Sequence, residues 1–151
     1  MIRRPPRSTL SSSSAASDVY KRQIEDRPGE LARIFSHLYD NDVRVSAFWV
    51  GPESQKTALR FIANDPESAV SVLTGLDLNA SLSDVLAAKI PNHPGGLNAV
   101  LKILESANVD IRHTYCSHDT QEAFLVLGVD KPGAATDALK DNWIELLKNN
   151  L

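Results

Sequence analysis

The chain has 151 residues, with 16 Lys and Arg, 19 Asp and Glu, a single Cys and a formal net charge of −3. This length suits one domain or two small ones, and no apolar run approaches the roughly 20 residues that cross a bilayer. Because Cys116 is alone, an internal disulfide is excluded and a reducing compartment is favoured, so we expect a cytoplasmic protein.

Residues 1–23 differ in composition from the rest of the chain. They are rich in Arg, Pro and Ser and lack apolar periodicity, so we expect them to be disordered. A basic, Ser-rich start suits a transit peptide or a nucleic-acid-binding arm, but the string from Ile2 to Gln23 more closely resembles the conceptual translation of a sequencing adapter. On that interpretation the segment is an artefact without function, and residues 19–24 imitate the truncated or replaced opening strand by chance.

The other 128 residues carry 11 basic and 18 acidic side chains, a net charge of −7. An acidic surface repels phosphate backbones. We therefore expect neither a nucleic-acid nor a membrane partner.

Residues 24–82 have the pattern of one small module. An apolar stripe with helical spacing follows a Pro-Gly turn, and Asp26 and Pro28 suit the cap and the first turn of that helix. A strand from residue 43, a second strand over 57–63 and a second helix from Pro66 follow. The helical stripe consists of Leu31, Ile34, Phe35 and Leu38, and alternation puts Val43, Val45, Ala47 and Trp49 on one face of the first of these strands.

Residues 83–151 repeat this module. Residues 26–66 return as 92–132 at a constant offset of 66, so that Leu38 corresponds to Leu104 and Pro66 to Pro132. Between the copies, residues 78–90 are long enough for two short strands in succession. The order within each copy is then strand, helix, strand, strand, helix, strand, which predicts an α+β, ferredoxin-like antiparallel sheet with both helices on one face.

The doubled unit, with Asp26-Arg27-Pro28-Gly29-Glu30-Leu31 and Asn92-His93-Pro94-Gly95-Gly96-Leu97 after the opening strands, resembles a tandem ACT-domain protein over about residues 24–147. The resemblance implies a non-catalytic, allosteric regulatory protein that binds a small molecule, typically an amino acid, without a cofactor or metal. It also implies association as a homodimer or with a metabolic enzyme.

The physical argument for a site rests on the two Pro-Gly loops. Gly29 and Gly95 lack a Cβ, so a ligand can approach the backbone, and the first helical N–H groups have no intrahelical partner and suit a carboxylate. In ACT domains the start of the second strand, often from a neighbouring domain, completes the pocket. The predicted ligand-binding residues are Asp26, Arg27, Pro28, Gly29, Glu30, Leu31, Asn41 and Val43 in the first copy, and Asn92, His93, Pro94, Gly95, Gly96, Leu97, Asn108 and Val109 in the second.

The second loop is the better candidate of the two. Gly96 should make it more open and His93 adds a polar contact, whereas Glu30 puts a carboxylate near the first loop that repels an anion. The alternative is that each Pro-Gly is only a helix-start signal.

Other functions are weaker candidates. His113, Cys116 and His118 are too few for a structural zinc site, and strand alternation divides them between two faces. An acylphosphatase-like hydrolase would use Arg27, but no loop has the glycine run of a phosphate cradle. A structural or interaction module, such as the detached regulatory part of an enzyme without its own ligand, also remains open. We expect Trp143 to anchor the last helix to the core.

Overall fold

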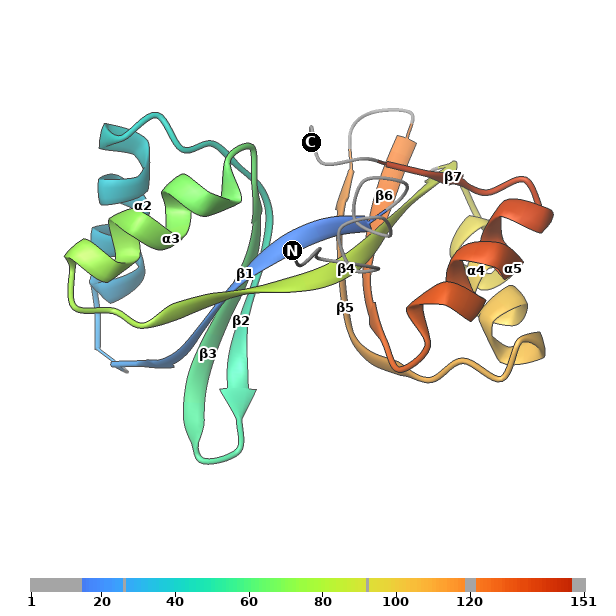
Figure 1. The fold of residues 1–151 in the computed structure, drawn as a ribbon, viewed down its shortest axis with the longest axis horizontal. Helices are drawn as coiled ribbons and strands as arrows, with labels where there is room; N and C mark the ends of the chain where they lie inside the picture. Colours follow the sequence, from blue (N-terminus) through green and yellow to red (C-terminus); the bar gives the residue numbers. More distant parts are fainter. Residues whose placement is uncertain (1–14, 26, 92, 119–121, 148–151) are drawn as a thin grey trace, which may run out of the picture. The chain divides into compact units, whose positions relative to one another are not determined.

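The computed structural model describes residues 15–25, 27–91, 93–118 and 122–147. The chain divides into two compact units, which we call the first lobe (Ser17–Ser83) and the second lobe (from Asp84 onward). Each lobe contains an antiparallel sheet and two helices (Figure 1), as predicted. Within the described ranges, no helix is long and apolar enough to cross a membrane.

The strand order is the same in both lobes. The elements of the first lobe are β1 (Ala15–Ile24), α2 (Glu30–Asp40), β2 (Val45–Glu53), β3 (Lys56–Ala63) and α3 (Pro66–Gly75), and those that follow are β4 (Ala80–Pro91), α4 (Gly96–Ser106), β5 (Ile111–His118), β6 (Glu122–Val129), α5 (Pro132–Asp141) and β7 (Glu145–Leu146). The first lobe has the order β2-β3-β1-β4 and the second has β5-β6-β4-β7, so β4 takes part in both.

The connection between the lobes differs from the expectation of two short strands. One continuous strand of 12 residues, β4, replaces them. No Gly or Pro interrupts residues 80–90, so nothing forces a turn there.

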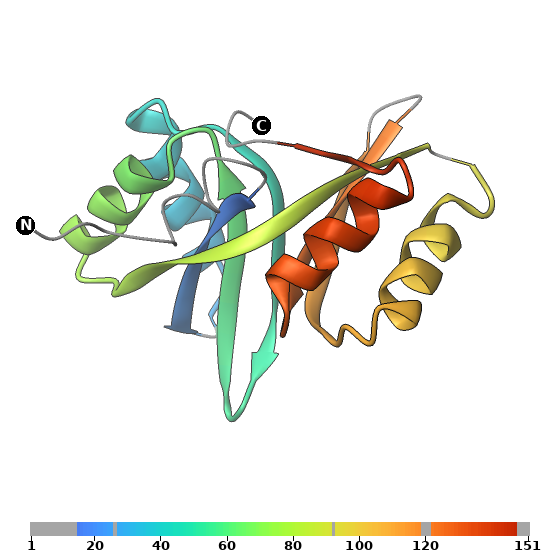
Figure 2. The ribbon, with the colours of Figure 1, turned by 45° about the vertical axis from the view of Figure 1, so that its right-hand side comes forward.

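The helices of each lobe cover one face of its sheet, and the core lies between them (Figure 2). In the first lobe, Ile34 and Leu38 of α2 are fully buried with Leu59 and Phe61 of β3. In the second lobe, the core combines Val100 and Leu104 with Leu125 and Leu127. The stripes predicted from helical spacing are therefore the buried faces of the helices.

In each lobe, the alternation predicted for the strand after the first helix is wrong from the third residue of the predicted face onward, which is Ala47 in the first lobe. The pairing of β2 with β3 shifts register between Val45 and Ala47, and that of β5 with β6 shifts between Ile111 and His113. Since a bulge of one residue reverses the alternation, it is Phe48 and not Ala47 that shares a face with Phe61. The Phe48 ring contacts the Phe35 ring at 5.2 Å between centroids.

Residues 15–23 form most of β1 instead of being disordered. Val19 lies opposite Phe61 in the core and Lys21 lies opposite Leu59, with a register shift between Arg22 and Ile24. In the second lobe, the repeat equivalents of Phe61 and Leu59 lie opposite Leu86 and Ala88. At the offset of 66, Leu86 and Ala88 correspond to Tyr20 and Arg22 and not to Val19 and Lys21. The strand β1 is thus one residue out of phase with its repeat.

The physical reason for this phase is Val19, the single aliphatic side chain between Asp18 and Gln23. Burying Val19 against the helices forces Lys21 onto the same face, where it is only 6% exposed. Burial lowers the pKa of the Lys21 ammonium below its usual range.

Trp143 does not anchor the last helix. It is 94% exposed and adopts φ +64°, the left-handed conformation, at the second position after α5. The next residue, Ile144, donates its backbone N–H to the carbonyl of Leu139 at 2.9 Å and packs against the core. The reversal at the helix end therefore turns the Ile144 side chain inward and leaves Trp143 outside.

Candidate ligand-binding site

Each lobe has an open turn at the start of its first helix, which we call the entrance. Gly29 and Gly95 occupy the N-cap positions with φ of +88° and +96°, and neither supplies a side-chain cap. A Cβ at either glycine would meet no atom within 4 Å, so the backbone is open to solvent. Because the caps are the glycines, Pro28 and Pro94 precede the helices rather than forming their first turns.

The first helical hydrogen bonds begin after the entrance. Arg33 N–H donates to the carbonyl of Gly29, and Ala99 N–H donates to that of Gly95, both at 2.9 Å. Among the described residues, the amides of Leu31 and Leu97 have no acceptor. These amides, with the positive end of the helix dipole, can receive a carboxylate. Asp26 and Asn92, predicted for the caps and the site, lie outside the described residues.

The first entrance is filled by its own ion pairs. The buried Glu30 carboxylate accepts from Arg33 Nη2 at 2.6 Å and from Arg27 Nη2 at 3.2 Å, and Arg27 Nε also lies 3.0 Å from Glu25. The hydrogen bond from Arg33 lowers the pKa of the Glu30 carboxyl below its usual range, with Arg27 adding to the effect. The repulsive carboxylate expected here is thus neutralised by two guanidinium groups.

The second entrance has none of these four side chains, because Pro91, His93, Gly96 and Ala99 stand at the equivalent positions. The expectation that Gly96 opens this loop needs revision. Gly96 is buried, and a Cβ there would lie 2.5 Å from the Pro91 carbonyl oxygen, so the missing side chain accommodates the protein's own backbone. Leu97, in contrast, is 48% exposed beside the open Gly95.

A groove lies at the opposite end of the same helix in each lobe. The first groove has a volume of ≈ 400 Å³, and the second one ≈ 600 Å³. The first is lined by Phe35, Leu38, Tyr39, Asp42, Val43, Arg44 and Val45, and the second by Leu101, Leu104, Glu105, Asn108, Val109, Asp110, Ile111, Asp130 and Lys131. The first seven residues of the second set are the offset-66 equivalents of the first set, so the groove is a repeated feature of the module.

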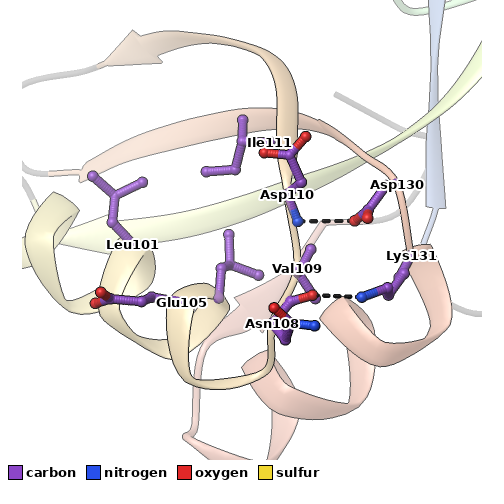
Figure 3. A pocket seen from close by; sticks show the side chains of 9 residues that line it. Leu101, Glu105, Asn108, Val109, Asp110, Ile111, Asp130 and Lys131 are labelled. Carbon is purple, nitrogen blue, oxygen red and sulfur yellow. Dashed lines mark hydrogen bonds between the residues drawn. The ribbon is translucent and has the colours of Figure 1, made fainter.

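Backbone links hold the strand start beside each groove. Asp110 N–H donates to Asp130 Oδ1 at 2.8 Å, and Lys131 Nζ donates to the Asn108 carbonyl at 2.6 Å (Figure 3). In the first lobe, Arg44 N–H donates to Asn64 Oδ1 at the same distance of 2.8 Å. In both lobes, the backbone N–H at the strand start therefore donates to a side chain at the same position of the repeat, but that side chain is Asp130 in the second lobe and Asn64 in the first.

Three of the four predicted strand-start residues line the grooves, and one does not. Val43, Asn108 and Val109 line the grooves. Asn41 does not, since its side chain donates to the His37 carbonyl at 2.9 Å at the helix end. The true equivalent of Asn108 is Asp42, and both adopt the left-handed conformation, with φ of +55° and +59°.

The entrance and the groove of one lobe cannot contact the same small molecule. They lie at the two ends of an 11-residue helix, which spans about 16 Å and is longer than a free amino acid.

Several polar residues of these regions were missed from the sequence. Arg33 lies one helical turn after the first entrance, and Arg44, Asp110, Asp130 and Lys131 border the grooves. Comparing the copies position by position at offset 66 would have found them, since the grooves keep Leu and Val while their charged residues change. In the described part of the chain, no group of three or more His, Cys, Asp and Glu could hold a metal ion.

Comparisons with known proteins agree with this architecture. A family model described as "ACT domain pair" matches residues 18–150. No curated protein matches the chain. Protein BT0572 from Bacteroides thetaiotaomicron has a similar structure, with a TM-score of 0.85, 24% identity, and coverage of 93% of this chain and 96% of that one.

Regulatory subunits of aspartate kinase share the fold as well. The one from Thermus thermophilus, in a ligand-free form, has a TM-score of 0.66 and 15% identity, covering 86% of this chain and 94% of its own. The one from Thermus flavus has a TM-score of 0.61 and 16% identity, covering 88% and 99%. At these identities the likeness concerns the fold.

Proposed function

Since this chain belongs to the ACT domain pair family, we propose that it is a non-catalytic cytoplasmic regulatory protein that binds an amino acid and responds to its concentration. The observation that carries the proposal is the glycine entrance, repeated in both lobes with an amide at Leu31 and at Leu97 that has no acceptor among the described residues. The α-carboxylate of an amino acid suits these amides, because they are preorganised donors at a helix N-terminus.

The second entrance is the better site for the ligand carboxylate. Its described loop, residues 93–97, contains no Asp, Glu, Lys or Arg, whereas the guanidinium groups at the first entrance already have carboxylate partners in Glu30 and Glu25. The predicted loop residues Arg27 to Leu31 would then support the first lobe, and His93 to Leu97 would contact the ligand. The same ion pairs argue against an acylphosphatase-like activity, for which Arg27 would have to face the substrate.

A thermal-shift screen of the twenty amino acids tests this function. A ligand at 100 times its dissociation constant stabilises the folded state by about 2.7 kcal/mol, which corresponds to a rise in melting temperature of roughly 5–10 °C for a chain of this size. If no amino acid changes the melting temperature, the proposal is wrong.

Two variants locate the site. Leu97→Glu places a carboxylate beside the second entrance and should abolish the shift by charge repulsion. Leu97→Gln, its neutral control of similar size, should retain the shift, because the side chain is 48% exposed and the backbone donors remain. Equal loss in both variants would place the ligand elsewhere.

The second candidate is a regulatory subunit that binds a metabolic enzyme without a ligand of its own. The exposed Trp143 favours it, since a large aromatic side chain held outside the core suits an interface. A pull-down that recovers one enzyme, combined with no response to amino acids, would support this candidate over the first.

A further inference from the structure

Glu30 is a buried charged residue at the start of α2. Its side chain is 4% exposed, whereas the side chains of Arg27 and Arg33 are 59% and 38% exposed. A carboxylate that leaves water needs charged hydrogen-bond donors to compensate for its lost hydration. The first entrance therefore contains an enclosed carboxylate with two more exposed guanidinium groups against it.

Both guanidinium groups converge on this one carboxylate. Arg33 donates from Nη2 to Oε1 of Glu30 at 2.6 Å and from Nε to Oε2 at 3.3 Å. Arg27 donates to Oε2 from Nη2 at 3.2 Å and from Nε at 3.4 Å. The two bonds from Arg33 form the fork in which a guanidinium group receives a carboxylate. An arginine pair would hold the carboxylate of a ligand in this way, but here the carboxylate belongs to the protein.

The second lobe has none of these charged side chains at the equivalent positions. Gly96 stands in place of Glu30, and His93 and Ala99 stand in place of the two arginines. The glycine at the N-cap, in contrast, is common to both lobes. Because the second lobe forms the same elements without the ion pairs, the cluster is a feature of the first entrance and not a requirement of the fold.

We propose that Glu30 is an internal carboxylate that fills the anion site of the first entrance and so restricts ligand binding to the second lobe. This inference rests on the proposed function and deepens it, because it names the residue that limits each chain to one bound carboxylate. An external carboxylate at the first entrance would have to displace Glu30 from Arg27 and Arg33. The displaced charge would lose its partners while buried, which strongly opposes the exchange.

Truncation of Glu30 should open this site to a small external carboxylate. The substitution Glu30→Ala removes Cγ, Cδ and both carboxylate oxygens, and acetate consists of the same heavy atoms. Arg27 keeps its ion pair with Glu25 at 3.0 Å. Arg33, among the described residues, has an ion pair with Glu30 alone. The variant therefore leaves the Arg33 guanidinium beside a space that acetate fits.

Thermal unfolding of the full chain in sodium acetate tests the proposal, with sodium chloride of equal ionic strength as the reference. One forked ion pair supports a dissociation constant on the order of 10 mM. At about 100 mM, acetate then shifts the unfolding equilibrium about elevenfold and should raise the melting temperature of Glu30→Ala by roughly 3–6 °C more than that of the wild type. Any acetate bound at the second entrance is common to both chains, so the difference between them reports on the first.

Three variants distinguish a built site from a freed cation. Glu30→Gln removes the charge but fills the same space with an amide, so it should respond to acetate no more than the wild type. Glu105→Ala removes the carboxylate of an exposed pair with Lys102, whose charged atoms lie 3.1 Å apart, and should also respond like the wild type. The double variant Glu30→Ala/Arg33→Ala should lose the response, because Arg33 is the group that holds acetate.

An acetate response of Glu30→Ala that is no larger than that of the wild type or of Glu30→Gln would overturn the proposal. If Glu30→Ala is unfolded in chloride, circular dichroism replaces the melting curve. Acetate should then restore the helical signal, and no recovery would overturn the proposal equally.

This result is independent of the amino-acid screen. Acetate binding by Glu30→Ala, combined with no response of the wild type to any amino acid, would retain the internal carboxylate and refute the proposed function. An amino-acid response of the wild type without acetate binding by Glu30→Ala would refute the role of Glu30 alone. The two failures are therefore distinguishable.

Discussion

Replacing Lys21 by Met should stabilise the first lobe. The Lys21 side chain lies on the helix-covered face of the sheet opposite Leu59 and is only 6% exposed. Its pKa is lowered because burial disfavours the charged ammonium. Met keeps the unbranched shape and removes the charge.

The size of the effect follows from the cost of burying a polar group. Protein mutational data place that cost at about 1–3 kcal/mol, so we expect Lys21→Met to raise the free energy of unfolding by about this amount. At roughly 2–4 °C per kcal/mol for a chain of this size, the melting temperature should rise by about 2–12 °C.

The pH dependence gives an independent test. The folded-state pKa of Lys21 is below its unfolded value of 10.5, so just below pH 10.5 the unfolded chain binds more protons. The wild type should therefore gain stability as the pH rises through the interval up to 10.5, and Lys21→Met should lack this gain.

Urea denaturation at pH 7 and near pH 10.5 measures both effects, with Lys56→Met at an exposed position of β3 as the control. If Lys21→Met is no more stable than the wild type at pH 7, or shows the same slope with pH, our account of β1 is wrong.

Three further results are expected. Glu30→Gln should flatten the acid sensitivity of unfolding, because the lowered pKa of Glu30 gives the wild type stability above pH 4.5 that is lost as the pH falls through the folded-state pKa; identical acid unfolding curves would contradict this. Gly96→Ala should destabilise by about 1–3 kcal/mol in chemical denaturation, since the new Cβ would meet the Pro91 carbonyl at 2.5 Å. Trp143→Asn should stabilise by roughly 1 kcal/mol in the same assay, because Asn tolerates the left-handed conformation with less strain, and a loss of stability would mean that Trp143 has a structural role.

The sequence predicted the glycine loops and, of the groove residues, only Val43, Asn108 and Val109. The Pro-Gly repeats located Gly29 and Gly95, because only a glycine-like residue is comfortable at φ near +90°. Arg33 and Asp130 gave no local signal. Their roles depend on contacts with Glu30, one helical turn away, and with Asp110, on another strand.

The sequence by itself determined the duplication, the order of elements and the helix faces that are buried, since these follow from spacing along one element. Leu38 and Leu104 illustrate this, because helical periodicity alone assigns them to the core. Only the tertiary structure decided the phase of β1, the bulges after Val45 and Ile111 and the exposure of Trp143. The reason is that strand register and side-chain burial are set by what lies opposite in space, and a shift of one residue moves every following side chain to the other face.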